Sequence, residues 1–278
     1  MQRLMTSKKI PASSLCFGTM QFGGKSSFYE SNTIYQSCRD SGINFFDTAH
    51  VYNEGRSEEF LGSVSCSERE NIIIATKAAY DCPATKKNIL TSFDESRKRL
   101  KSDFVDILYM HRWDNHVPLE ETLTGLAELK QQGLIRYIGV SNYSAWQTMK
   151  AQAICHNLNI SIDVIQPMYS LVKRQAEVEI LPMALSEKIS VCPYSPLGGG
   201  LLTGKYHQGD TGRLTEDQRY KKRYSLEWMH NTASNLSLLA TRYNVSPSTL
   251  AIAWVSNNKS ISAPIISASS LKQLNPSI

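Results

Sequence analysis

Four residues able to take part in proton transfer follow short apolar segments of the sequence. Asp47, Lys77 and His111 each end one such segment, and Tyr52 lies five residues after Asp47. A carboxylate, an ammonium, an imidazole and a phenol are groups that enzymes use as general acids and bases. Taken singly, each has an ordinary explanation, such as a packed tyrosine or a surface lysine. Their position at the ends of successive apolar segments instead predicts one shared site.

Eight short apolar runs alternate with longer amphipathic segments along the chain. These runs are too short for buried helices and are rich in Ile, Val and aromatic residues, so we predict strands. The predicted strands are Leu15–Phe17, Ile43–Phe46, Ile72–Ala75, Phe104–Tyr109, Tyr137–Val140, Asp163–Gln166, Ser190–Pro193 and Ala263–Ile266. The predicted helices are Glu30–Ser41, Ser57–Val64, Lys86–Leu100, Leu119–Gln132, Ala145–Asn157, Gln175–Ser186 and Ser246–Asn257.

This alternation indicates an α/β fold, and eight strands are the number that closes a (β/α)8 TIM barrel. Reactive groups in that fold lie at the C-terminal ends of the strands. An open doubly wound sheet is the alternative, but no Gly-x-Gly-x-x-Gly motif follows an early strand. We therefore predict one barrel domain over residues 1–278.

Local signals mark several boundaries within this domain. Ser144 suits a helix N-cap, and Gly42 and Gly133 suit positions just after a helix end. The stretch from Gly198 to about His230 is predicted to be a long irregular loop. Because it follows the seventh strand, we expect it to lie over the mouth of the barrel.

The composition, with 41% hydrophobic and 20% charged residues, is that of an ordinary globular protein. The formal charge of +5 is a mild basic bias, and no nucleic-acid-binding motif accompanies the basic cluster at 221–223. We therefore expect no nucleic-acid partner. No stretch of 18 apolar residues occurs, so we expect no membrane span. Six scattered cysteines without metal-ligand spacing predict no metal site and a reducing, cytoplasmic location.

Several separated motifs resemble those of the aldo-keto reductase family. Residues 47–62, DTAHVYNEGRSEEFLG, resemble the family signature DTAxxYxxGxSExxLG. Further likenesses lie at residues 76–77, 110–112, 139–142 and 193–205. They occur in the family's order from about Leu15 to about Leu274, and the glycine-rich segment resembles the potassium-channel β-subunit and related bacterial branches. The resemblance implies an NAD(P)H-dependent carbonyl reductase on a single barrel.

The resemblance also implies a role for each of the four polar residues. Tyr52 would protonate the carbonyl oxygen as hydride arrives from the nicotinamide. Lys77 would lower the pKa of this phenol from its ordinary value near 10. Asp47 would hold Lys77 charged in a partly buried site, and His111 would donate a hydrogen bond to the substrate oxygen. No metal is implied, since these residues would polarise the carbonyl.

The cofactor implied by the resemblance is NADPH (NADP+), with NADH as the alternative. Ser141, Asn142 and Gln166 would hold the nicotinamide carboxamide, and Tyr194 would stack on its ring. Further expected contacts are Gly18, Thr19 and Met20 after the first strand, Ser195, Leu197, Gly199 and Lys205 near the pyrophosphate, and Ser267, Ser269 and Gln273 after the last strand.

The C-terminal segment departs from the family pattern. Ser267 and Ser269 replace a frequent Gly and Arg, and Pro276 is expected to end the last helix after about two turns. We therefore predict a barrel with a truncated C-terminal helix and tail. Without that arginine, the preference for NADPH over NADH stays open. A shortened helix would expose apolar surface, which favours a homo-oligomer.

Three functions are compatible with these residues. The first is reduction of a small-molecule carbonyl compound. The expected pocket residues Met20, Phe22, Tyr80 and Trp113 favour an apolar or aromatic substrate. The second is a cofactor-binding regulatory subunit with little turnover. The third is a Schiff-base aldolase using Lys77, which the neighbouring Asp47 disfavours because it keeps the lysine protonated.

Overall fold

A computed structural model describes residues 4–278, apart from the side chains of residues 207 and 208. Its centre is a parallel eight-stranded sheet in the order β7-β6-β5-β4-β3-β2-β1-β8. The strands are β1 (Cys16–Gly18), β2 (Phe45–Asp47), β3 (Ile73–Ala78), β4 (Val105–Met110), β5 (Ile135–Ser141), β6 (Val164–Gln166), β7 (Ser190–Val191) and β8 (Ile265–Ile266).

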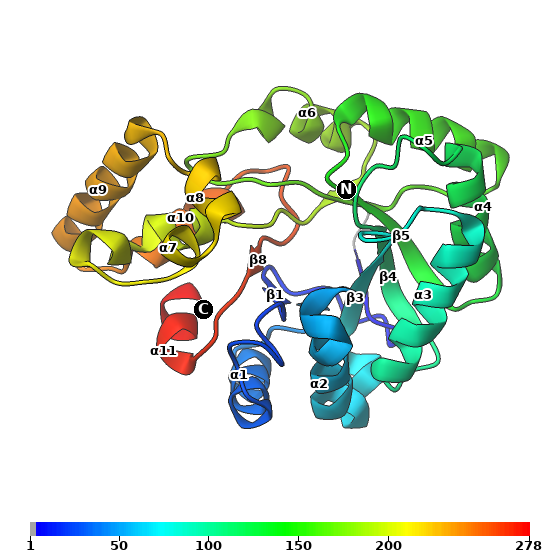
Figure 1. Cartoon of the computed structure of the whole chain (residues 1–278), viewed down its shortest axis with the longest axis horizontal. Helices are drawn as coiled ribbons and strands as arrows, with labels where there is room; N and C mark the ends of the chain where they lie inside the picture. Colours follow the sequence, from blue (N-terminus) through cyan, green and yellow to red (C-terminus); the bar gives the residue numbers. More distant parts are fainter. Residues whose placement is uncertain (1–3) are drawn as a thin grey trace.

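Backbone contacts beyond the ends of β7 join it to β8 and close the sheet. Tyr194 and Ile265 form a parallel bridge, and the Ile265 N–H donates to the Pro193 carbonyl at 2.8 Å. The closed sheet confirms the predicted α/β fold and TIM barrel (Figure 1).

Helices follow the strands in sequence and lie around the sheet (Figure 1). The α-helices after β1 to β6 are α1 (Phe28–Asp40), α2 (Arg56–Ser65), α3 (Lys86–Arg99), α4 (Leu119–Gln131), α5 (Ala145–Asn157) and α6 (Ile180–Ser186). Those after β7 and β8 are α7 (Arg213–Glu216), α8 (Gln218–Arg223), α9 (Glu227–Arg242), α10 (Pro247–Ser256) and α11 (Leu271–Leu274). The 3-10 helices are η1 (Tyr52–Gly55), η2 (Cys66–Asn71), η3 (Gln175–Glu177), η4 (Gly198–Thr203), η5 (Lys205–Gln208) and η6 (Asn275–Ser277).

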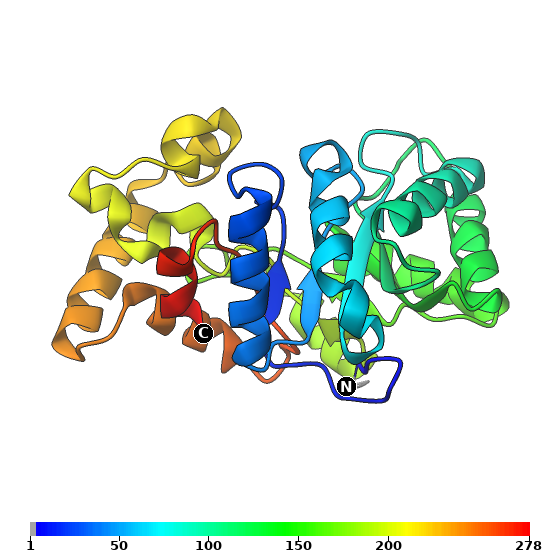
Figure 2. The ribbon, with the colours of Figure 1, turned by 90° about the horizontal axis from the view of Figure 1, so that it is seen from below.

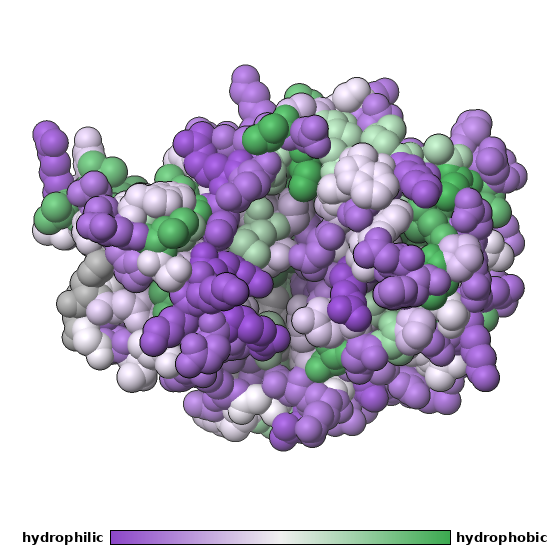
Figure 3. Space-filling view, turned by 45° about the horizontal axis from the view of Figure 1, so that its top comes forward, coloured by the Kyte–Doolittle hydropathy of each residue, from purple (hydrophilic) through white to green (hydrophobic). Residues whose placement is uncertain are grey.

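Alternate residues of each strand belong to two different apolar clusters. Ile73 and Ala75 of β3 pack with residues of the other strands in one cluster, whereas Ile74 packs with the helices in another. Side chains alternate between the two faces of a strand, so the first cluster fills the barrel interior. Lys77 continues the interior series of β3. On the visible outer face, hydrophilic residues predominate around smaller hydrophobic patches (Figure 3).

Capping residues predicted from the sequence occupy their expected positions. The Ser144 hydroxyl accepts a hydrogen bond from the Gln147 N–H, and the Gln147 side chain in turn accepts one from the Ser144 N–H. Gly42 and Gly133 follow α1 and α4 with φ angles of 79° and 72°, a left-handed conformation that favours glycine. These predictions are confirmed.

The region after β7 corrects the prediction of an irregular loop from Gly198 to about His230. It contains η4, η5, α7, α8 and the beginning of α9. The sequence also failed to predict α9, and the segment predicted as one helix at 175–186 is divided into η3 and α6. Figure 2 shows α7 and α8, in yellow, at the end of the molecule opposite the N-terminus.

The α-helix after β8 is shorter than the two turns expected, since it ends at Leu274, before Pro276. The four-residue α11 is followed by η6, which contains Pro276. The Thr249 hydroxyl of α10 donates to the Pro276 carbonyl at 2.7 Å. Figures 1 and 2 show α11 beside α1. No helix in the described part of the chain is both long and apolar enough to cross a membrane.

Candidate active site

Three polar side chains from β2, β3 and β6 meet inside the barrel. Lys77 Nζ donates to Asp47 Oδ1 and to the Thr48 carbonyl, the latter at 2.7 Å. Gln166 Nε2 donates to the second Asp47 oxygen at 2.9 Å. Only 1% of Lys77 and 3% of Asp47 is exposed. Buried charges are stable only when paired and hydrogen-bonded, and both conditions are met here.

The turn that carries Tyr52 is fixed to the loop after β1. Tyr52 begins η1, and the next two residues, Asn53 and Glu54, have φ angles of 51° and 58°. This left-handed conformation is uncommon for non-glycine residues, although Asn adopts it more readily. Asn53 Nδ2 donates to the carbonyls of Met20 and Phe22 at 2.9 and 2.7 Å. These two bonds hold the turn in place.

Tyr52, in the turn after β2, lies with Lys77 and His111 at the C-terminal ends of β3 and β4. Lys77 Nζ is 4.9 Å from the centroid of the Tyr52 ring. The rings of Tyr52 and His111 meet edge to face, with centroids 5.9 Å apart. His111 Nδ1 is buried and has no hydrogen-bond partner among the residues that the structure describes. The structure thus brings together the four residues singled out by the sequence.

Burial dominates the electrostatics of this site. It raises the pKa of Tyr52 above its ordinary value, and the lowering effect of Lys77 is smaller. Lys77 thus acts in the expected direction, but burial outweighs it, so the pKa of Tyr52 is raised and not lowered overall. Burial would lower the pKa of Lys77, but attraction by Asp47 and Tyr52 raises it overall, so Lys77 stays charged. Burial, with the nearby charges of Lys77 and Arg112, lowers the pKa of His111 to about 3, so His111 is neutral at pH 7.

Comparison with known proteins places this site in a family. The model of the aldo/keto reductase family matches residues 14–278. The chain belongs to the aldo/keto reductase family. It is therefore an oxidoreductase of a family that reduces carbonyl compounds, typically with NAD(P)H.

Relatives of this aldo/keto reductase carry several different names. A probable voltage-gated potassium channel subunit beta of Arabidopsis thaliana is 33% identical over 285 residues, which cover 95% of this chain and 86% of the relative. The aldo-keto reductase YhdN of Bacillus subtilis is 35% identical over 266 residues, which cover 88% of this chain and 78% of the relative. The L-glyceraldehyde 3-phosphate reductase of Escherichia coli O157:H7 is 30% identical over 294 residues, which cover 97% of this chain and 84% of the relative.

Residues expected to hold the nicotinamide surround the four central side chains. The Tyr194 hydroxyl donates to Asn142 Oδ1 at 2.7 Å, and Asn142 Nδ2 donates to the His111 carbonyl at 2.9 Å. The Ser141 hydroxyl donates to the Gln166 carbonyl at 3.1 Å. The ends of β5, β6 and β7 thus meet beside the reductase site.

Residues expected near the pyrophosphate lie in the segment after β7 and bond mainly within it. The Ser195 carbonyl accepts from the Gly198 N–H at 2.9 Å, and Leu197 packs between two apolar clusters. Lys205 Nζ donates to the Thr211 carbonyl at 3.0 Å. At Gly199, with φ of 67°, a Cβ would lie 2.9 Å from the Tyr220 ring, so glycine permits this close approach.

The residues after β1 differ in what they can offer a ligand. Gly18 lies beside the segment after β8, because a Cβ at this position would be 3.9 Å from the Ser267 Cβ. The Thr19 hydroxyl is buried and hydrogen-bonded to Ser57 at 2.9 Å. It therefore serves the packing of this loop, and only the half-buried Met20 remains partly accessible.

The residues after β8 mostly bond to one another. The Ser269 N–H and hydroxyl both donate to Gln273 Oε1 at 3.0 Å. The Ser269 carbonyl accepts from the Ser26 hydroxyl at 3.2 Å, which attaches this segment to the loop after β1. The Ser267 hydroxyl is buried and has no hydrogen-bond partner among residues 4–278.

The donors at the barrel mouth fit a nicotinamide dinucleotide. Buried polar groups in proteins are nearly always partnered, so the unpaired Ser267 hydroxyl and His111 Nδ1 are atoms that a ligand would satisfy. Asn142 bonds to the His111 carbonyl and also to Ser141 and Tyr194. These residues supply polar groups and one aromatic ring where a nicotinamide would be held.

The residues expected to line the substrate pocket lie at different depths in the structure. Tyr80 lies 4.7 Å from His111 between ring centroids, so it borders the site. Phe22 is fully buried and packs on Phe17, so its assignment to the pocket is wrong. Two features were missed: the Gln166 bond to Asp47 and the Asn53 bonds to the loop after β1. The partners of both lie far away in the sequence, which leaves no local signal for them.

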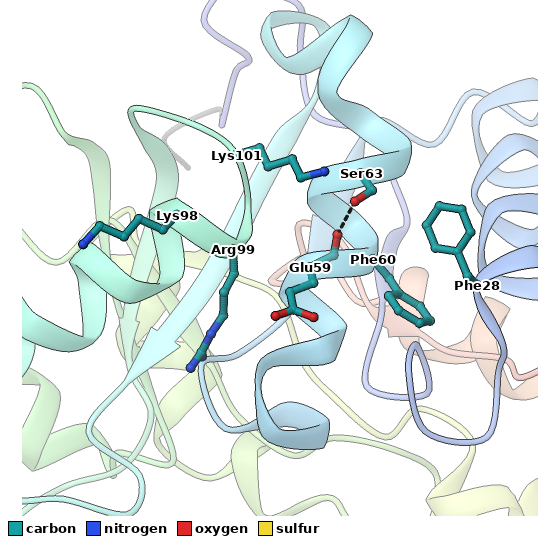
Figure 4. A pocket seen from close by; sticks show the side chains of 7 residues that line it. All are labelled: Phe28, Glu59, Phe60, Ser63, Lys98, Arg99 and Lys101. Carbon is teal, nitrogen blue, oxygen red and sulfur yellow. Dashed lines mark hydrogen bonds between the residues drawn. The ribbon is translucent and has the colours of Figure 1, made fainter.

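An open groove of about 530 Å³ lies on the helical layer, away from the residues of the reductase site. Phe28, Glu59, Phe60, Ser63, Lys98, Arg99 and Lys101 line it. Figure 4 shows the three basic side chains on one side of α2 and the two phenylalanines on the other. Arg99 also donates to Glu58 Oε2 at 3.3 Å, so part of its charge serves the packing of α2 on α3.

Proposed function

We propose that this chain reduces an aldehyde or a ketone to an alcohol, with NADPH as the preferred hydride donor and NADH as the alternative. The observation that carries the proposal is the buried Asp47–Lys77 pair beneath the Tyr52 ring. A bound reduced nicotinamide supplies hydride to the carbonyl carbon. Tyr52 supplies the proton to the carbonyl oxygen, which completes the alcohol.

The neighbouring residues prepare Tyr52 for this transfer. Lys77 stays charged and stabilises the phenolate that remains when the proton has left. His111, neutral at pH 7, donates a hydrogen bond to the substrate oxygen and orients it. Because Asp47 keeps Lys77 protonated, Schiff-base chemistry at this lysine is disfavoured.

The alternative is a cofactor-binding regulatory subunit with little turnover. It is favoured by the likeness to the plant protein named as a potassium channel subunit. The complete set of Asp47, Tyr52, Lys77 and His111 favours turnover instead. Both functions require cofactor binding, so only catalysis separates them.

The deciding experiment combines binding and turnover. Quenching of tryptophan fluorescence would measure the Kd of NADPH and of NADH, and NADPH oxidation would follow the reduction of simple aldehydes. We expect saturable binding and turnover, with kcat falling by about 10²- to 10⁴-fold in Tyr52→Phe while the Kd of NADPH is retained. Binding without turnover of any aldehyde would support the regulatory function and contradict ours.

Two further expectations concern the state of the protein. All six cysteines are free, which supports a reducing, cytoplasmic location. Self-association stays a prediction, and sedimentation of a strict monomer would contradict it.

A further inference from the structure

Arg112 lies at the outer end of a row of rings that begins at Tyr52. His111 lies against Tyr52 on one side and against Tyr80 on the other, with centroid distances of 5.9 and 4.7 Å. The Arg112 guanidinium carbon is 5.3 Å from the Tyr80 centroid. Two steps of 4.7 and 5.3 Å place this guanidinium no more than about 10 Å from the His111 ring.

The charge of Arg112 is not neutralised by a neighbouring carboxylate. Its side chain is exposed, and no ion pair or hydrogen bond connects it to another residue in the described ranges. The carboxylate of Asp114, two residues later, instead accepts from the N–H groups of Ala84 and His116 at 2.9 and 2.8 Å. Stacking on Tyr80 leaves all five N–H donors of Arg112 available.

The exposed arginine of α8 whose charge interacts with Tyr80 already has a partner. Arg219 of α8 forms an ion pair with Asp217 at 2.9 Å, and Lys25 pairs with Glu216. Arg112 differs from Arg219 and Lys25 in having no carboxylate partner among the described residues, and it differs from Arg223, which stacks on Tyr220, in lying over Tyr80 beside His111. A planar guanidinium with free donors matches a carboxylate or a phosphate group by two parallel hydrogen bonds.

We propose that the substrate is an anionic carbonyl compound whose carboxylate or phosphate group is bound by Arg112, with Tyr80 against its body. This inference rests on the proposed reductase function and adds the substrate class. The reacting carbonyl lies at Tyr52 and His111, and the negative group lies at the far end of the row of rings. A benzaldehyde with a para carboxylate has a suitable length for this distance.

The test uses two substrates that differ in charge but share one ring. These are 4-carboxybenzaldehyde and its methyl ester. The ester group activates its aldehyde more strongly than the carboxylate does, so a preference for the acid cannot come from intrinsic reactivity. We expect the wild-type protein to show a higher kcat/KM for the acid than for the ester. Arg112→Gln should lower kcat/KM for the acid by roughly fivefold, the upper range for an exposed ion pair, and leave the ester unchanged.

Two control variants separate binding of the anion from general effects. Arg112→Lys keeps the charge but not the paired donors, so it should recover part of the preference for the acid. Arg219→Gln removes an exposed arginine that already has its own carboxylate, so it should affect both substrates equally. Added salt should also reduce the preference for the acid, because the pair is exposed.

The possible failures are distinguishable. An equal loss for acid and ester in Arg112→Gln, or no loss for either, would overturn the anionic substrate class and leave the reductase function standing. Reduction of neither compound, despite cofactor binding, would overturn the proposed function and this inference with it.

Discussion

Polar side chains at the C-terminal ends of β2, β3 and β6 are buried and bonded to one another. Apart from Tyr194, which bonds to Asn142, the residues expected to contact the cofactor after β7 and β8 bond mainly within their own segments. Asp47 has partners from two other strands, Lys77 and Gln166, that lie 30 and 119 residues away in sequence. Ser269 and Lys205 have partners four and six residues away. A side chain fixed by distant strands keeps its position as long as the barrel stays folded. One fixed by its own segment can move with that segment.

This difference indicates that one part of the barrel mouth serves proton transfer and another serves cofactor binding. Proton transfer requires atoms held at a defined distance, which the rigid ends of β2 to β4 provide. Binding of a large cofactor requires a surface that can adapt, and the segments after β7 and β8 are built for that. Substitutions in the first region should therefore affect stability and catalysis together, whereas those in the second should affect chiefly cofactor affinity.

The largest effect is expected from breaking the Asp47–Lys77 pair. Lys77→Met leaves the Asp47 carboxylate buried without its main partner, and we expect the free energy of unfolding to fall by about 3–5 kcal/mol. Reductase activity should be lost as well. Urea denaturation would measure the change, and the double variant Asp47→Leu/Lys77→Met should recover much of the stability but no activity. Equal instability of the single and double variants would contradict this account.

A smaller effect is expected at Gln166. Gln166→Leu removes the donor to Asp47 Oδ2, which should reduce the free energy of unfolding by about 1–3 kcal/mol. The charge of Asp47 would then be less offset and would raise the pKa of Tyr52, so the basic limb of the pH profile of kcat should move to higher pH. Ser141→Ala is the matched control, because Ser141 bonds to the Gln166 backbone carbonyl and not to Asp47. An unmoved profile would show that Gln166 acts on the cofactor alone.

The third expected effect is a pH dependence caused by His111. Its pKa is lowered to about 3 in the folded protein, while the unfolded imidazole titrates near 6.5. Below pH 6.5 the unfolded chain binds a proton that the folded chain does not. The free energy of unfolding therefore decreases as the pH is lowered, by at most about 1.4 kcal/mol per pH unit. Urea denaturation between pH 7 and 4.5 should show a shallower slope in His111→Gln than in the wild type. The exposed His116→Gln should retain the wild-type slope, and equal slopes in all three would refute the assignment.

The smallest effect is expected after β8. Gln273→Ala removes the acceptor of two exposed hydrogen bonds from Ser269. We expect a loss of about 0.5–1.5 kcal/mol in unfolding free energy and a weakening of NADPH binding by no more than about tenfold. Fluorescence titration would measure the binding. If this single change abolished cofactor binding or unfolded the protein, the contrast between the two regions would fail.

The sequence predicted the region at the ends of β2 to β6 better than the segments after β7 and β8. Short apolar runs mark the barrel strands, and the residues that end them, such as Lys77 and His111, fall at the C-terminal ends of those strands. Helix α9 was missed because it begins after Leu226 without a capping side chain, although Met229, Ala233, Leu236 and Ala240 recur at helical spacing. The net pKa of Tyr52 was also missed, because burial depends on the folded barrel.

The turn after Tyr52 links two segments that the sequence separates. Asn53 holds this turn by bonding to the carbonyls of Met20 and Phe22 in the loop after β1. The position of the proton donor Tyr52 therefore depends on the loop after β1 as well as on β2. A chimera that took the loop after β2 from one parent and the loop after β1 from another would misplace the phenol unless the new loop offered the same two carbonyls. The two loops have to be inherited, or engineered, together.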